Sequence, residues 1–191
     1  MSTPGAEVDP DRFRKVMGRF ATGVTVVAAE HDGEMHGMTA NAVTSVSLDP
    51  LLLLVCVGRR ARMSRWLERA GGFTVNILTE DQEALSRYFA GTWPHAAPPE
   101  FRFVPWEGGP RLVAALAALG CRRERLIEAG DHRIVLGRVI ALYEGDAAAQ
   151  PLLFYGGRYR RLSPAEAAPA PELWTGTDVR IYYDEWWQGP R

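Results

Sequence analysis

Runs of apolar and β-branched residues predict that most of this chain is β-strand. Strands are expected at residues 24–29, 51–57, 73–78, 121–127, 132–143, 151–155 and 158–162. His31-Asp32-Gly33 supplies turn chemistry, so a hairpin is expected to lead from the first strand into the segment that begins at His36. Gly156-Gly157 is expected to form the turn before the last strand.

Helical spacing begins close to the N-terminus. Asp9 followed by Pro10 is a typical helix start, and Thr22-Gly23 is expected to end this helix. The apolar residues that repeat at helical spacing are Phe13, Val16, Met17 and Phe20. Residues 60–69 predict a second, short amphipathic helix.

The middle of the chain is less regular. Thr79 with Gln82 three residues later is a capping box that opens a third helix. Residues 91–110 are rich in Pro, Gly and Trp and predict a long loop or flap. Residues 111–120 look helical by propensity, but their place in a β-rich half favours strand for part of them. Because strands and helices do not alternate regularly, a β-barrel decorated by helices is expected.

Composition predicts one domain with a sizeable core. The chain has 191 residues, 47% of them hydrophobic, and its formal net charge of −1 gives no reason to expect a nucleic-acid or membrane surface. No stretch approaches the roughly 20 apolar residues of a membrane span. The N-terminal segment is polar and lacks an apolar signal core, so a cytoplasmic protein is expected. Cys56 and Cys121 are expected to be buried free thiols.

Familiar catalytic motifs are absent from the sequence. There is no GxGxxG after a strand, no GxxxxGK[ST] and no GxSxG elbow. The histidines are scattered without metal-ligand spacing, so no metal site is expected: His31, His36, His95 and His132. A protein without an acid–base constellation can leave the chemistry to a cofactor and supply binding and orientation.

Small side chains crowd the segment from residue 36 to residue 50. They are Thr39, Ala40, Asn41, Ala42, Thr44, Ser45 and Ser47. One interpretation is a flat ligand that lies against the backbone, with main-chain N–H groups and hydroxyls on its acceptors. The other interpretation is a strand that packs closely under a helix. Composition alone leaves both open.

Several short motifs follow one another in a fixed order. They are Phe13-Arg14, FATGVTVV from Phe20, GMTANA from Gly37, Ser45-Val46-Ser47, Asp49-Pro50, FTVNIL from Phe73, Ser86, Phe89-Ala90-Gly91, Gly130-Asp131-His132 and Gly137-Arg138-Val139. This ordered series spans roughly residues 10–162. It resembles the short-chain flavin reductase family, which contains the reductase components of two-component flavin monooxygenases.

The resemblance implies a flavin-binding split β-barrel over residues 1–162, with peripheral helices and a flavin site near the interface of a homodimer. It implies that NADH or NADPH reduces free FMN or FAD, and that the reduced flavin leaves for a separate oxygenase. The implied flavin-binding residues are Thr39, Ala40, Asn41, Ala42, Ser45, Val46, Ser47, Cys56, Gly58, Arg59, Arg62, Met63, Phe89, Ala90 and Gly91.

His132 and Tyr159 are the residues implied for the pyridine nucleotide. We expect His132 to orient the nicotinamide rather than to transfer a proton, because direct hydride transfer to flavin depends mainly on geometry. Relatives carry a small hydroxyl residue near Ala61, which is missing here. Arg59, Arg60 and Arg62, with the helix N-terminus, are expected to replace it electrostatically, and the alternative is that these arginines form a solvated helix face.

Two other functions fit a split barrel of this kind. One is a flavin- or haem-binding module without turnover, and the other is an oxidase that keeps its flavin tightly bound. Residues 163–191 lie beyond the resemblance and read as a linker followed by an aromatic extension. Its aromatic residues are Trp174, Tyr182, Tyr183, Trp186 and Trp187. Because aromatic residues favour burial, this extension is expected to dock on the dimer, and the alternative is a contact surface for the oxygenase.

Overall fold

The computed structural model describes residues 8–163, and β-strands dominate them. The helices are α1 (Pro10–Met17), α2 (Arg62–Arg69) and α3 (Glu83–Phe89). The strands are β1 (Thr22–Gly23), β2 (Thr25–His31), β3 (Glu34–Ala40), β4 (Val43–Leu48), β5 (Leu51–Gly58), β6 (Gly72–Ile77), β7 (Phe103–Val104), β8 (Arg111–Leu112), β9 (Ala117–Ala129), β10 (His132–Glu144), β11 (Leu153–Tyr155) and β12 (Arg158–Arg160). The predicted β-rich fold with peripheral helices is confirmed.

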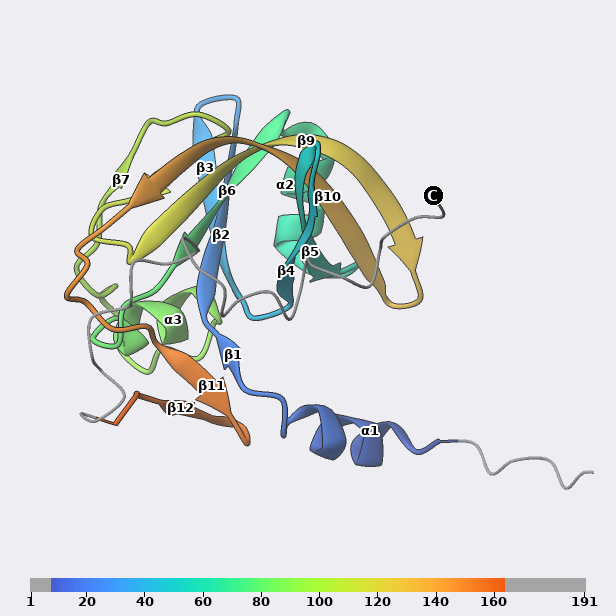
Figure 1. Cartoon of the computed structure of the whole chain (residues 1–191), viewed down its shortest axis with the longest axis vertical. Coiled ribbons are helices and arrows are strands. Elements are labelled where there is room, and N and C mark those ends of the chain that lie inside the picture. Colours follow the sequence, from blue (N-terminus) through green and yellow to red (C-terminus); the bar gives the residue numbers. More distant parts are fainter. Residues whose placement is uncertain (1–7, 164–191) are drawn as a thin grey trace, which may run out of the picture.

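One antiparallel sheet forms the body of the molecule. Its seven strands follow the order β3-β2-β6-β9-β10-β5-β4, and the sheet curls strongly (Figure 1). Its two edge strands, β3 and β4, do not pair with each other. The main-chain N–H of Cys56 in β5 nevertheless donates to the oxygen of Ala42, just beyond the end of β3, at 2.9 Å. A curled sheet with an open seam is the split β-barrel that was expected.

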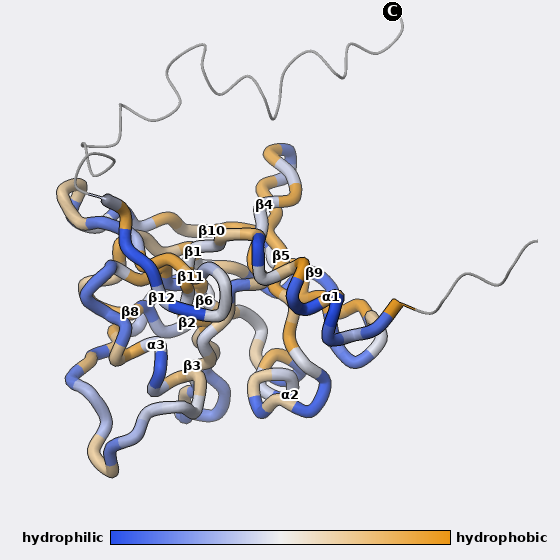
Figure 2. Tube along the Cα trace, turned by 90° about the horizontal axis from the view of Figure 1, so that it is seen from below, coloured by the Kyte–Doolittle hydropathy of each residue, from blue (hydrophilic) through white to orange (hydrophobic). Residues whose placement is uncertain are grey.

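Strand β2 separates two apolar clusters. Val27 and Ala29 belong to a cluster that includes Leu67 of α2, whereas Val26 belongs to a cluster that includes Leu85 of α3. Successive side chains of a strand point to opposite faces, so a strand covered on both faces reads as an unbroken apolar run. In Figure 2 orange positions follow β5 and β10, and blue positions gather around α1 and α2.

A glycine lets β10 approach the core closely. A Cβ on Gly137 would lie 2.6 Å from Cζ of Phe73 and 3.0 Å from Cβ of Cys121. Both neighbours are fully buried, so a larger residue at position 137 would have to displace the core. Burial raises the pKa of the Cys121 thiol to about 12, so this thiol stays protonated and unreactive.

The first helix is shorter than predicted. Asp9 caps it by accepting hydrogen bonds from two main-chain N–H groups of the first turn, and Pro10 takes the first helical position, as expected. The helix ends at Met17. The prediction that Thr22-Gly23 ends it is wrong, because these residues form β1 and pair with β11.

Three other boundaries differ from the sequence-based expectation. The second helix begins at Arg62 rather than at residue 60, because the chain first makes a turn in which the N–H of Ala61 donates to Gly58. Residues 111–120 supply β8 and the start of β9, so the strand assignment is confirmed only at their two ends. The N–H of Thr79 donates to the side-chain oxygen of Gln82 at 3.0 Å, as a capping box requires. Both residues nevertheless lie before α3, which begins at Glu83.

Two further expectations from the sequence concern a membrane span and the C-terminal extension. Within residues 8–163, no helix is long and apolar enough to cross a membrane. The aromatic extension and nearly all of the expected linker lie outside the described residues.

Candidate functional site

The sheet is interrupted between β3 and β4, where the small residues lie. Ala40 is the last residue of β3 paired with β2, and Val43 is the first residue of β4 paired with β5. Asn41 and Ala42, between them, are exposed and belong to neither ladder. Their main-chain N–H groups are therefore donors that the sheet itself does not use, and such donors need water or a ligand.

The part of the segment before this interruption packs under α3. A Cβ on Gly37 would lie 2.5 Å from Cε1 of Phe89, so the phenyl ring occupies the space beside the glycine. The hydroxyl of Thr39 donates to the main-chain oxygen of Ser86 at 2.7 Å, and the Ser86 hydroxyl lies 2.9 Å from that of Tyr159. Close packing under a helix is therefore confirmed for the part of the segment before the interruption, and a ligand against residues 41–42 stays a prediction.

Strands β5 and β10 bring His132 beside this interruption. His132 stands opposite Gly58 in the ladder, and a Cβ on Gly58 would lie 4.0 Å from Nε2 of His132. Cys56, two residues before Gly58, points to the same face and donates its N–H to Ala42. Ala42, Cys56, Gly58 and His132 thus follow one another across one face of the sheet.

Asp131 orients the imidazole of His132. The distance between Nδ1 of His132 and Oδ1 of Asp131 is 2.8 Å. This hydrogen bond, and the charge of the imidazole, lower the pKa of the Asp131 carboxyl, which is almost fully exposed. Because Asp131 engages Nδ1, Nε2 is the ring nitrogen that faces Gly58.

A cavity of about 880 Å³ opens next to His132. One wall is the turn after β5, residues 58–61, and the other is the turn between β9 and β10, residues 130–133. Arg59, Arg60 and Arg133 lie in its walls. Helix α2 starts at its edge with Ala61 as the capping residue, which supplies no side-chain acceptor to the first turn. Arginines and helix N–H groups together favour an anionic group.

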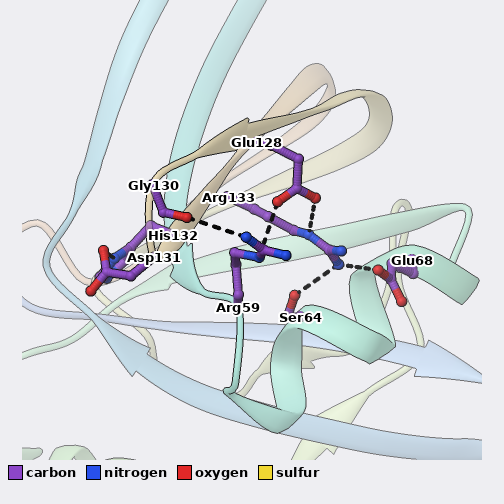
Figure 3. Close-up of polar contacts among 8 residues, drawn as sticks. All are labelled: Arg59, Ser64, Glu68, Glu128, Gly130, Asp131, His132 and Arg133. Atoms are coloured by element: carbon purple, nitrogen blue, oxygen red, sulfur yellow. Dashed lines mark hydrogen bonds and ion pairs between the residues drawn. The ribbon is translucent and has the colours of Figure 1, made fainter.

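Two carboxylates, those of Glu128 and Glu68, pair with Arg59 and Arg133 (Figure 3). Glu128 contacts Nε of Arg133 at 2.6 Å through one oxygen and Nε of Arg59 at 3.2 Å through the other. Arg133 also donates to Ser64 at 3.1 Å and to the carboxylate of Glu68 on α2. The network ties the β9–β10 turn to α2 and fixes the width of the cavity.

Two of the candidate residues lie elsewhere. Met63 is fully buried in the core under α2, so its side chain is not available to a ligand. Arg62 lines a second pocket, together with Trp66 and Arg69. Burial and the charge of Arg62 lower the pKa of His36, whose ring stacks on that of Trp66 with 5.8 Å between the centroids. The phase of α2 thus turns these side chains away from the cavity, and the arginines that line it are Arg59, Arg60 and Arg133.

The other candidates surround the interruption or α3. Val46 is exposed and lies on β4 with Ser45 and Ser47, and Ala90 and Gly91 are exposed at the end of α3.

The prediction from sequence missed Arg133 and Glu128. A signal existed, because a hairpin turn centred on Gly130-Asp131 places residues 128 and 133 opposite each other with opposite charges. Among the described residues, no group of His, Cys, Asp or Glu could hold a metal ion.

Comparison with known proteins assigns the family. The family model for the flavin reductase like domain matches residues 17–163. The match spans most of the chain, so the protein belongs to the flavin reductase-like family.

Three relatives illustrate the similarity. An NADH-dependent flavin reductase from a Rhodococcus species is 45% identical over 159 residues, 82% of this chain and 88% of the relative. The reductase component of 4-hydroxyphenylacetate 3-monooxygenase from Thermus thermophilus is 44% identical over 152 residues, 80% of this chain and 96% of the relative. The Streptomyces globisporus NADH:FAD oxidoreductase SgcE6, in complex with NAD and FAD fragments, matches with a TM-score of 0.73 and 42% identity, over 84% of this chain and 98% of that structure.

The residues present fit a flavin. Asn41 and Ala42 offer main-chain donors on a surface without bulk, which suits the edge of a flat ring that carries acceptors. Arg59 and Arg60, beside the start of α2, suit the phosphate that FMN and FAD carry. These two surfaces adjoin, because Gly58 lies two residues after Cys56 along β5.

Replacing Ala42 by leucine tests the ring surface. Ala42 is exposed, so the fold is expected to survive while the larger side chain fills the space for the ring. We expect the Kd for FMN, measured by flavin fluorescence, to rise roughly 5- to 150-fold, which corresponds to about 1–3 kcal/mol of overpacking. Ala147→Leu, at another exposed alanine, is the matched control. Unchanged FMN affinity in a folded Ala42→Leu protein removes this segment from the site.

Proposed function

We propose that this chain is an NADH-dependent flavin reductase that supplies reduced flavin to a separate monooxygenase. The observation that carries the proposal is the line of Ala42, Cys56, Gly58 and His132 across one face of the sheet, beside a cavity with arginines in its walls. Family membership and the relatives named as flavin reductases and as a monooxygenase reductase component support it. Both FMN and FAD are proposed substrates, since each carries a phosphate that the arginines of the cavity suit.

The chain's own residues bind and align the reactants. A bound flavin accepts a hydride from the reduced nicotinamide, and this chemistry belongs to the two cofactors. Asn41 and Ala42 hold the edge of the ring through their main-chain N–H groups, and Arg59 holds the phosphate. His132, oriented by Asp131, positions the nicotinamide. Since the reaction is a direct hydride transfer, alignment is the main contribution that the protein makes.

Multiple turnover of free flavin tests the proposal. We expect steady loss of NADH absorbance when FMN or FAD is present in large excess over the enzyme, and loss of flavin from the protein during gel filtration. A module without turnover would bind flavin without consuming NADH. An oxidase with a tightly bound cofactor would retain flavin through the column and would not reduce added flavin.

His132→Ala separates nicotinamide positioning from flavin binding. We expect kcat/KM for NADH to fall roughly 10- to 100-fold, because a misplaced reactant loses the aligned geometry, while the Kd for FMN stays within a factor of two. His95→Ala, in the exposed loop after α3, is the control. A lower melting temperature with unaltered kinetics would show that His132 has only a structural role.

A homodimer is part of the proposal. Apolar side chains stay exposed on this single chain at the β4–β5 hairpin, including Leu48 at 62% and Leu51 at 45%, and near the end of β10, where Leu142 is 65% exposed. Single proteins rarely leave large apolar patches uncovered, and a second copy would cover these. We place the protein in the cytoplasm, where its two free cysteines would stay reduced.

Light scattering measures the assembly directly. We expect about twice the 21.2 kDa chain mass at working concentration. Leu48→Glu is expected to shift the protein towards monomer, because a buried unpaired charge destabilises an apolar interface. Met35→Glu, at a 46% exposed apolar residue of β3, is the control. A monomer with full reductase activity would contradict this part of the proposal.

A further inference from the structure

Glu128 lies where it can compete with a ligand for Arg59. Arg59 lines the cavity, and its Nε pairs with Oε2 of Glu128 at 3.2 Å. Its NH1 reaches the main-chain oxygen of Gly130 at 3.5 Å. A guanidinium binds phosphate best through an edge that presents two N–H groups side by side. The Nε of Arg59 is engaged by a carboxylate of the protein itself (Figure 3).

Arg133 keeps Glu128 in this position. The two residues stand opposite each other in the β9–β10 ladder, and Nε of Arg133 donates to Oε1 of Glu128 at 2.6 Å. Arg133 is itself held by Ser64 and Glu68 of α2, and only 20% of its side chain is exposed. The hydrogen bonds to Glu128 and Glu68 raise the pKa of Arg133. Glu128 is thus anchored through one oxygen and pairs with Arg59 through the other.

We propose that Glu128 is an internal competitor for the ligand phosphate: it holds Arg59 in the absence of ligand and must release it before Arg59 can bind a phosphate group. The phosphate belongs to the flavin or to the pyridine nucleotide, and the shared chemistry is a phosphate monoester or diester. The inference rests on the proposed function for the identity of the ligand, whereas the competition itself requires only an anion in the cavity.

The competition limits affinity without abolishing it. If Arg59 is available in only a fraction of the molecules, the apparent Kd rises by the inverse of that fraction. Arg59 and Glu128 are both more than half exposed, with side-chain exposures of 55% and 57%, so the pair is weak and shifts the equilibrium roughly 2- to 5-fold. A reductase that passes its flavin to another enzyme must also release it, and recapture of Arg59 by Glu128 favours release.

Glu128→Gln tests the competition, because glutamine keeps the shape of the side chain and removes its charge. We expect the Kd for FMN to fall roughly 2- to 5-fold, while the Kd for riboflavin, which has no phosphate, stays unchanged. NAD⁺ and nicotinamide riboside form the corresponding pair for the pyridine nucleotide. If only FMN gains affinity over riboflavin, the flavin phosphate reaches Arg59. If only NAD⁺ gains affinity over nicotinamide riboside, the phosphate of the pyridine nucleotide does. The gain is expected to shrink as ionic strength rises, since exposed charges are screened.

Two further variants control for the position of the charge. Glu124→Gln removes a similar carboxylate from β9, one that pairs with Arg138 at 3.0 and 2.9 Å and does not contact Arg59. We expect no change in any Kd. Arg59→Gln, added to Glu128→Gln, is expected to abolish the gain in affinity for the phosphate-bearing ligand, because the guanidinium for which Glu128 and the phosphate compete is then missing.

Pyrophosphate provides a probe that is independent of flavin chemistry. Calorimetric titration is expected to give tighter pyrophosphate binding to Glu128→Gln than to the unsubstituted protein. Equal tightening of FMN and riboflavin, weaker FMN binding, or no gain with FMN, NAD⁺ and pyrophosphate overturns the inference. If the unsubstituted protein turns over no flavin, the proposed function fails, and the pyrophosphate result still decides whether Glu128 competes for Arg59.

Discussion

Burial of Val135 determines on which side of β10 the candidate site residues lie. The side chains of this strand point alternately into the core under α2 and to the opposite side of the sheet. Val135 packs in the core under α2, and Arg133 points to the same side of the sheet. His132 and Ile134 therefore stand on the opposite side, where His132 is half exposed. A shift of the register by one residue would exchange the two sets and expose the core residues. Ladders with β5 and β9 on both sides of β10 hold this register.

The same alternation separates neutral from charged contacts. On one side of β10, His132 adjoins Gly58 and, through Cys56, the open main chain of Ala42, which suits a flat ring. On the other side, Arg133 holds Glu128, the carboxylate that pairs with Arg59, and the guanidinium of Arg59 suits a phosphate. A ligand that carries both a ring and a phosphate can therefore use both sides of one strand where it meets the cavity.

The predictable features are those that depend on neighbours in sequence. Local composition and hydrogen-bonding chemistry predict the Asp9 cap, the buried strands and the segment of small side chains that contains Asn41 and Ala42. The pairing of Thr22–Gly23 with β11 depends on a strand near the other end of the described chain, so no local signal contains it. Tertiary packing also overrode the helical propensity of residues 111–120.

For the candidate site, the phase of α2 was decisive. The helix starts at Arg62 rather than at residue 60, so its predicted length was nearly right. Which face of the helix packs against the core was not predicted: that packing buries Met63 and directs Arg62 to a different pocket. By contrast, the opposition of Glu128 and Arg133 is local to one hairpin and was available from the position of its turn.

Amide hydrogen exchange with and without FMN tests the central claim most directly. Asn41 and Ala42 lie outside both ladders, so their amides are expected to exchange fast in the free protein and to slow when the ring covers them. The account predicts that FMN protects residues 41–42 together with the first turn of α2 and residues 130–132. Protection confined to other parts of the chain, such as residues 81–85 and 99–102, which line a pocket at the start of α3, would contradict it.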